Sequence, residues 1–274
     1  MAFILSIQTK GGCGKSTCSQ QILAPYFLAK NEPVTLIEID DENLDSSYLL
    51  DSAVKTEQFS FGTSASAERV VESLFSRVNE NLVVDVGGNR TATNFIAAAG
   101  RFGLFEYIDL VVIPISGPGQ DETNAIRTAN AIKAVAPAVK IMMVVTRQPA
   151  RSDAEFDDIF KRYFDVEELE KITTHICHFP HVMAMIHSRY LEMTLYEMAI
   201  MRDKLINDLA NRMMLAAKSG STAAALKIGR VRSSVQESHE ILPFIEACHR
   251  VIDNTLEGLC CTNHGLRPSG RMTA

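Results

Sequence analysis

The sequence lacks the features that define several classes of protein. No apolar run approaches the roughly 20 residues of a membrane span, and a net charge of -6 excludes a protein coated in basic surface. A local basic patch, and with it weak DNA binding, stays open. Residues 1–7 are apolar but have no basic segment and no cleavage site, so we expect a buried strand there and not a signal peptide.

The cysteines show no spacing typical of a metal site. None of them forms a C-x-x-C pair. No cysteine lies between Cys18 and Cys177, which excludes the iron–sulfur cluster of a nitrogenase iron protein. We interpret all of them as reduced thiols and therefore expect a cytoplasmic location. They are Cys13, Cys18, Cys177, Cys248, Cys260 and Cys261.

Short, continuous apolar runs alternate with helical patterns along the chain. Such runs are typical of strands buried on both faces, and hence of a mostly parallel sheet. The predicted strands are 3–7, 33–39, 82–86, 108–115, 139–145 and 173–179, and the predicted helices are 15–29, 65–79, 92–102, 121–135 and 195–217. Residues 40–63 are polar, and we expect them to be rich in loops. The pattern predicts an α/β fold, with helices on both faces of a twisted sheet.

The C-terminal third differs from the rest in composition. We predict a main domain over residues 1–217, a linker at 218–222, a helical C-terminal extension over 223–261 and a disordered tail at 262–274. Apolar residues recur at helical spacing between Ile241 and Leu259. No internal repeat is present.

The segment Lys10-Gly-Gly-Cys-Gly-Lys-Ser-Thr17 carries the main functional signal. It follows a predicted strand and opens a predicted helix, which is the context of a phosphate-binding P-loop. We expect the backbone amides of Gly11, Gly12, Cys13, Gly14 and Thr17 to surround phosphate groups. Lys15 should contact the β- and γ-phosphates, and the Ser16 hydroxyl should bind Mg²⁺.

Lys10, followed by Gly-Gly-x-Gly-Lys-Ser, makes this loop a deviant Walker A motif. On this motif the chain resembles the ParA/MinD family of P-loop ATPases. The resemblance implies Mg-ATP as ligand, a homodimer that closes on ATP, and a Lys10 that reaches the nucleotide of the partner subunit. It also implies slow hydrolysis stimulated by a protein partner.

Acidic residues follow two of the predicted strands. The family commonly shows D-x-D after the second strand, where this chain has Glu38-Ile39-Asp40. The resemblance assigns Asp40 to the attacking water or to the Mg²⁺ shell, and leaves the role of Glu38 open. Asp85 ends the third strand, where a buried carboxylate is costly unless something pairs with it. A water-bridged Mg²⁺ would be such a partner, as in a Walker B strand. Gly87 and Gly88 resemble the switch that senses the γ-phosphate.

Recognition of the base has a weaker signal. Strand 139–145 is followed by Thr146-Arg147-Gln148, where related guanine binders carry N-K-x-D. Because that motif is absent, we expect adenine, with Arg147 beside the nucleotide. The segment Phe179-Pro180-His181 resembles the later loop of the family, which places Pro180 near the base.

The primary hypothesis is a partition or positioning ATPase whose dimer binds a surface such as nonspecific DNA. Candidate DNA contacts are Arg189, Arg202, Lys204 and Arg212 on the late helix, and Lys227, Arg230 and Arg232 beyond the linker. The acidic residues of 241–259 argue against membrane contact.

The alternatives are a small-molecule ligase or kinase on the same scaffold, and an ATP-binding adaptor with almost no turnover. His175, His178, His181 and His187 cluster in sequence, but their spacing does not match an H-E-x-x-H helix. DNA-stimulated ATPase activity would favour partition, and substrate-dependent turnover would favour the small-molecule enzyme.

Overall fold

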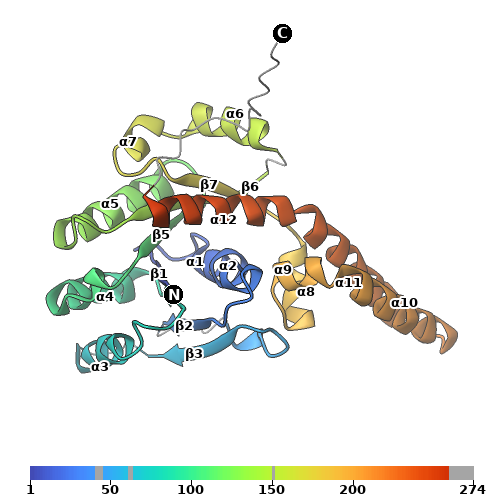
Figure 1. Ribbon diagram of the computed structural model, residues 1–274. Helices are drawn as coiled ribbons and strands as arrows, with labels where there is room; N and C mark the ends of the chain where they lie inside the picture. The colour runs from blue at the N-terminus through green and yellow to red at the C-terminus, as the bar shows by residue number, and fades with distance from the viewer. Residues whose placement is uncertain (41–45, 61–63, 150–151, 259–274) are drawn as a thin grey trace, which may run out of the picture.

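The protein is built around a parallel sheet with helices on both faces (Figure 1). The computed structural model describes residues 1–40, 46–60, 64–149 and 152–258. In that part of the chain the sheet has seven strands in the order β3-β2-β4-β1-β5-β6-β7. They are β1 (Phe3–Ser6), β2 (Thr35–Ile39), β3 (Lys55–Phe59), β4 (Leu82–Val86), β5 (Leu110–Ile115), β6 (Ile141–Gln148) and β7 (Ile176–Pro180). The predicted α/β class is confirmed.

Alternate residues of each strand point to opposite faces of the sheet. Leu5 and Val84 belong to one buried cluster, whereas their neighbours Ile4 and Val83 belong to the other. Both faces are covered, which is why these strands read as continuous apolar runs. The helices over the first face are α3 (Ser64–Phe75), α4 (Asn89–Phe102), α5 (Gln120–Val135), α6 (Asp153–Tyr163) and α7 (Val166–Glu170).

The second face is covered by helices from both ends of the chain. They are α1 (Lys15–Cys18), α2 (Ala24–Ala29), α8 (Ala184–Leu191), α9 (Leu195–Ile200) and α12 (Leu242–Glu257). The C-terminal region is helical as predicted, and Ile245, Cys248 and Ile252 of α12 are fully buried. A ring nitrogen of His249 lies 2.9 Å from the carbonyl oxygen of Ile22. Helix α12 therefore packs into the same core as the first helices.

The first predicted helix, 15–29, is interrupted. A π-helical turn (Ser19–Leu23) separates α1 from α2. Pro25 explains the interruption, because its ring removes one backbone donor and clashes with the carbonyl four residues earlier, so the turn widens. Gln20 and Gln21, both buried, belong to this turn.

Helices α10 (Arg202–Lys218) and α11 (Thr222–Glu240) form a hairpin, hereafter the arm, which projects from the body (Figure 1). The predicted linker at 218–222 coincides with its turn, where Gly220 adopts φ +77°. None of the residues from 211 to 230 is buried, so the two helices contact little besides each other there.

Two parts of the structure differ from the sequence-based prediction. Strand β3 lies within the segment expected to be rich in loops, because its polar sequence KTEQF forms an edge strand that pairs with β2 alone. Helices α6 to α8, and the short 3-10 turns Ser46–Tyr48 and Leu104–Glu106, were not predicted. Cys260, Cys261 and the tail 262–274 lie outside the described residues.

Among the helices of the described ranges, none has both the length and the apolar character needed to cross a lipid bilayer.

Candidate functional site

The loop between β1 and α1 has the backbone of an anion cradle. Gly12 and Gly14 adopt φ values of +72° and +98°, in the left-handed region that favours glycine. A Cβ on Gly14 would lie 2.6 Å from Oγ1 of Thr146, which itself donates a 3.1 Å hydrogen bond to the carbonyl of Cys13. The end of β6 therefore supports the loop and leaves no room for a side chain at Gly14.

Lys15 is buried, although it is a cation at the start of a helix. Its Nζ donates a 3.0 Å hydrogen bond to the carbonyl of Lys10, so the ammonium group lies against the backbone of the same loop. Burial raises the pKa of the neighbouring Cys13 thiol, although the Lys15 charge opposes the shift. Cys13 is therefore a protonated thiol, and Lys15 is the buried cation facing the cradle.

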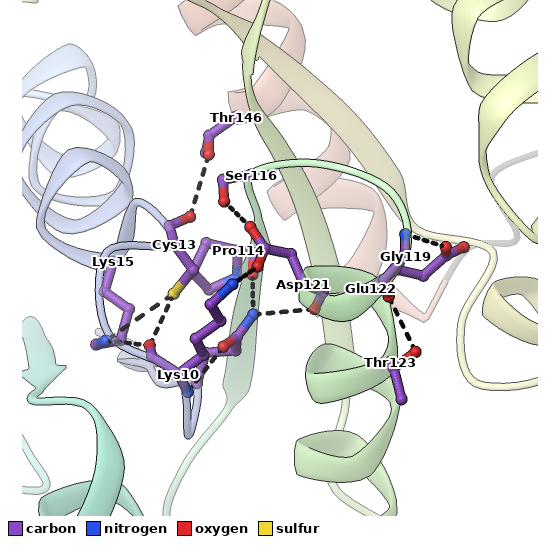
Figure 2. A network of polar contacts seen from close by, with 11 residues as sticks. Lys10, Cys13, Lys15, Pro114, Ser116, Gly119, Asp121, Glu122, Thr123 and Thr146 are labelled. Atoms are coloured by element: carbon purple, nitrogen blue, oxygen red, sulfur yellow. Dashed lines mark hydrogen bonds and ion pairs between the residues drawn. The ribbon is translucent and has the colours of Figure 1, made fainter.

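Lys10 is held outside the cradle (Figure 2). Its Nζ forms an ion pair with Asp121 at the start of α5, and the Ser116 hydroxyl also donates to that carboxylate. Burial raises the pKa of Asp121, but the hydrogen bonds from Lys10 and Ser116 outweigh burial and hold this pKa below its usual value. Lys10 does not line the cavity described below, whereas Lys15 does.

Buried Gln8 positions the backbone of Lys10. Its side-chain oxygen accepts a 2.9 Å hydrogen bond from the amide of Lys10, and its side-chain nitrogen donates to the carbonyl of Pro114 at 3.0 Å. The loop start is thus tied to β5, and Lys10 to α5. Sequence reasoning missed Gln8, Ser116 and Asp121, because no local pattern brings them to Lys10.

Three carboxylates meet at the strand ends beside the cradle. The register of the sheet places both Ser6 and Glu38 opposite Asp85. Asp40 packs against Gly87, where a Cβ would lie 2.7 Å from its carboxyl carbon. This edge of the sheet therefore gathers acidic groups from β2, from the residue that follows it and from β4.

Asp85 is an incompletely satisfied buried carboxyl. Its Oδ1 has no hydrogen-bond partner among the described residues. Burial raises the pKa of Asp85 to about 7, against the lowering effects of a hydrogen bond with Ser16 and the charge of Lys15. A buried oxygen of this kind calls for a ligand atom.

The oxygen donors fit a magnesium ion that retains other ligands. Within the described residues, no group of three or more His, Cys, Asp or Glu side chains is placed to hold a metal alone. Mg²⁺ commonly binds through one or two protein oxygens, with phosphate oxygens and water completing the octahedron. Ser16 and the unpartnered oxygen of Asp85 match that requirement.

A cavity of about 770 Å³ joins these parts. It brings together every residue predicted at the phosphates and the metal except Lys10 and Cys13. Arg147, which adopts φ +61° at the end of β6, also lines it. The lining residues outside the prediction include Gln20, Gln21, Tyr48, Asn89, Arg90, Thr91, Asn94 and Met185.

A second cavity, of about 510 Å³, adjoins the first and has a more apolar wall. Both cavities are lined by Thr17, Arg147, Met185 and Arg189. Pro180, predicted near the base, ends β7 and contributes to this wall with Phe179 and His181.

Arg189 lies on α8, not on the late helix with which the sequence grouped it. Its guanidinium carbon is 5.4 Å from the centre of the Tyr48 ring, so it faces the cavities. The other candidate DNA-contact residues do lie on the arm. They are Arg202, Lys204 and Arg212 on α10, and Lys227, Arg230 and Arg232 on α11.

The clustered histidines do not converge on a site. His178 is buried and stacks on Phe156, with ring centres 4.2 Å apart, while Nδ1 of His187 lies 2.7 Å from the hydroxyl of Ser234. His181 lines the second cavity.

Similarity to known proteins exists at the level of structure. No protein-family model and no curated protein matched the sequence. The cell division protein MinD of Aquifex aeolicus superposes with a TM-score of 0.50 at 15% identity, over 70% of this chain and 87% of that one. A chain of the MinC:MinD cell division protein complex of the same organism gives 0.52 at 13% identity, with the same coverage. A plasmid partition protein of Borrelia burgdorferi gives 0.45 at 16% identity, over 65% and 90% of the two chains.

The parallel sheet and the glycine-rich loop between β1 and α1 define a P-loop nucleotide-binding fold. Within that class the chain has a ParA/MinD-like fold, as the deviant Walker A motif predicted.

Proposed function

We propose that this protein is an ATP-dependent dimerising switch of the ParA/MinD type, with slow Mg-ATP hydrolysis that a protein partner stimulates. The observation that carries the proposal is the contrast between its two loop lysines. Lys15 faces the cradle of its own chain, whereas Lys10 lies outside that cavity on Asp121. Because Lys10 lies beside the loop but does not line the cavity of its own chain, it is suited to contact the nucleotide of a second copy of the protein.

The roles of the site residues follow from this proposal. The amides of Gly11 to Thr17 and the Lys15 ammonium hold the phosphates, and Ser16 and Asp85 hold Mg²⁺, whose charge offsets that of the phosphates. Asp40 orients the attacking water, and Gly87 and Gly88 sense the γ-phosphate. The more apolar second cavity, with Pro180 and Arg147, receives adenine.

Replacement of Lys10 by alanine is expected to abolish ATP-dependent dimerisation and to leave nucleotide binding largely intact. The reason is that Lys10 would complete the site of the partner subunit, while Lys15 serves its own. Light scattering after size exclusion, with a nonhydrolysable ATP analogue and Mg²⁺, measures this. Lys55→Ala on β3, which removes an exposed lysine of the same charge, is the matched control. A Lys10→Ala protein that still dimerised would contradict the trans role.

We further propose that the dimer binds DNA through the arm, acting in the cytoplasm in plasmid partition or intracellular positioning. Residues 202–232 contain seven Lys or Arg and two Asp, in a chain of net charge -6. Arg212 is paired with Asp208 on the arm itself, while Lys204, Arg230 and Arg232 have no partner among the described residues. A projecting basic hairpin matches the charge of a phosphate backbone.

The triple variant Lys204→Ala, Arg230→Ala and Arg232→Ala is expected to weaken DNA binding and to reduce its salt dependence. Each lost phosphate contact should lower the slope of log K against log salt by about 0.9. Fluorescence anisotropy of a labelled duplex over a salt series, with the ATP analogue present, measures the slope. A triple variant outside the arm, with Lys161→Ala and Arg162→Ala on α6 and Lys171→Ala just after α7, makes the same change in net charge. Equal slopes for the two triple variants would remove the arm from the interface.

A further inference from the structure

Helix α4 begins in direct contact with the phosphate loop. The amide of Asn89 donates a 2.7 Å hydrogen bond to the carbonyl of Thr9, and a Cβ on Gly88 would lie 2.9 Å from the Gly11 nitrogen. Asn89 adopts φ +53°, a left-handed conformation that asparagine tolerates better than most residues. The backbone at Arg90 is therefore fixed relative to the cradle.

Arg90 lines the same cavity as Lys15 and Asp85. Its side chain is exposed, and no described residue forms a hydrogen bond or an ion pair with it. The two lysines of the loop are engaged: Lys10 with Asp121, and Lys15 with a loop carbonyl. Arg90 is thus a cation at the cavity wall, and its guanidinium N–H donors have no partner among the described residues.

The cavity is suited to a polar, charged ligand. Besides Asp85 Oδ1, the buried side-chain nitrogen of Gln20, which also lines it, has no partner among the described residues. An arginine presents several N–H donors in a plane that matches two phosphate oxygens at once. The backbone of Arg90 is held next to the cradle, so such a group can stabilise charge that develops on a transferred phosphoryl group.

We propose that Arg90 is a catalytic residue that stabilises, from within the same chain, the charge on the γ-phosphoryl group during hydrolysis. In that step, water attacks the γ-phosphorus, the bond to the β-phosphate oxygen breaks, and ADP, inorganic phosphate and a proton are released. The inference rests on the proposed ATPase function. It adds Arg90 in cis to Lys15 of the same chain and to Lys10 from the partner subunit, so that Arg90 acts in the monomer as well as in the dimer.

The test compares Arg90→Ala, Arg90→Lys and the control Arg101→Ala. Arg101 lies on the same helix and forms an exposed ion pair with Glu68. Three quantities are measured for each protein: single-turnover hydrolysis of saturating Mg-ATP, affinity for Mg-ADP, and affinity for Mg-ADP with aluminium fluoride, which imitates the transferred phosphoryl group. Light scattering with a nonhydrolysable ATP analogue measures dimerisation.

For Arg90→Ala we expect hydrolysis and aluminium fluoride affinity to fall together, by roughly 10²–10³-fold, the typical effect of removing one donor to the transition-state charge. Mg-ADP affinity and dimerisation should stay within about twofold of the parent protein, because the proposed contact is with the γ-phosphoryl group, which ADP lacks. Arg90→Lys should recover part of the rate, because lysine keeps the positive charge. The recovery should be incomplete, because lysine lacks the planar set of N–H donors of arginine. Arg101→Ala should match the parent protein.

Two results would overturn the assignment. Hydrolysis and aluminium fluoride affinity within about threefold of the parent would show that Arg90 has no role in the transition state. Loss of dimerisation in Arg90→Ala, with an unchanged rate in the monomer, would make Arg90 an interface residue. Failure of the proposed function itself is distinguishable, because the parent protein would then bind no Mg-nucleotide.

Discussion

Lys15→Ala is expected to lower the affinity for Mg-ATP by roughly 100-fold, because charged hydrogen bonds each contribute about 1.5–3 kcal/mol. Lys15 is buried beside the cradle, and among the described residues no other lysine lines the cavity. No second described lysine can therefore supply an ammonium group at the β- and γ-phosphates. Isothermal titration with a nonhydrolysable ATP analogue and Mg²⁺ measures the loss.

The control for Lys15→Ala must separate lost binding from lost folding. Lys15 donates its hydrogen bond to the carbonyl of Lys10, so its removal also loosens the loop. The thermal midpoint without nucleotide should change little, because the cradle is also supported by the hydrogen bond from Thr146 to Cys13. Lys55→Ala again serves as the matched lysine variant. Full affinity in a folded Lys15→Ala protein would remove this lysine from the phosphate site.

The second large effect concerns Asp85, whose buried carboxyl destabilises the nucleotide-free fold at neutral and higher pH. Its pKa is about 7 in the folded protein against an ordinary value of 3.8, so the folded state binds the proton more tightly than the unfolded state. The stabilising contribution of the protonated group is complete below pH 3.8 and is lost as the pH rises through 7. A shift of this size corresponds to about 4 kcal/mol as an upper bound.

Asp85→Asn should therefore raise the free energy of unfolding in Mg²⁺-free buffer, by a few kcal/mol at pH 8 and by much less at pH 5. The same substitution should abolish the Mg²⁺ dependence of nucleotide binding, since the amide is a poor substitute for a carboxylate ligand. Urea denaturation with EDTA at both pH values measures the first effect. Asp158→Asn, which removes an exposed carboxylate paired with Arg162, is the control.

A gain in stability that was equal at pH 5 and pH 8 would contradict this account, because it would point to packing and not to ionisation. Together the two effects would identify Asp85 as a residue that costs stability until a cation reaches it. Its unpartnered oxygen is the structural sign of that cost.

The phosphate loop could be predicted because its chemistry is local. The residues that must approach an anion, Gly11 to Thr17, are consecutive, and the flanking apolar run and helical pattern are consecutive too. The buried strands were predictable for the same reason, since a strand covered on both faces must be apolar throughout. Asp85 was recognised because a carboxyl ending such a run requires a partner.

Other elements gave no such signal. Strand β3 is polar because it lies at the edge of the sheet, and a polar strand has the same composition as a loop. The break between α1 and α2 depends on how the chain relaxes around Pro25, which helical periodicity does not report. Arg189 was grouped with the wrong helix, since α8 was not recognised.

The sequence by itself determined the class of fold and the nature of the phosphate loop, because both arise from residues that are neighbours along the chain. The tertiary structure alone decided which side chains surround that loop. Asp121 meets Lys10 across more than a hundred residues, and Arg90 reaches the cavity only because Gly88 allows α4 to touch the loop. Contacts of this kind depend on strand order and on close backbone approach, and neither leaves a periodic trace in the sequence.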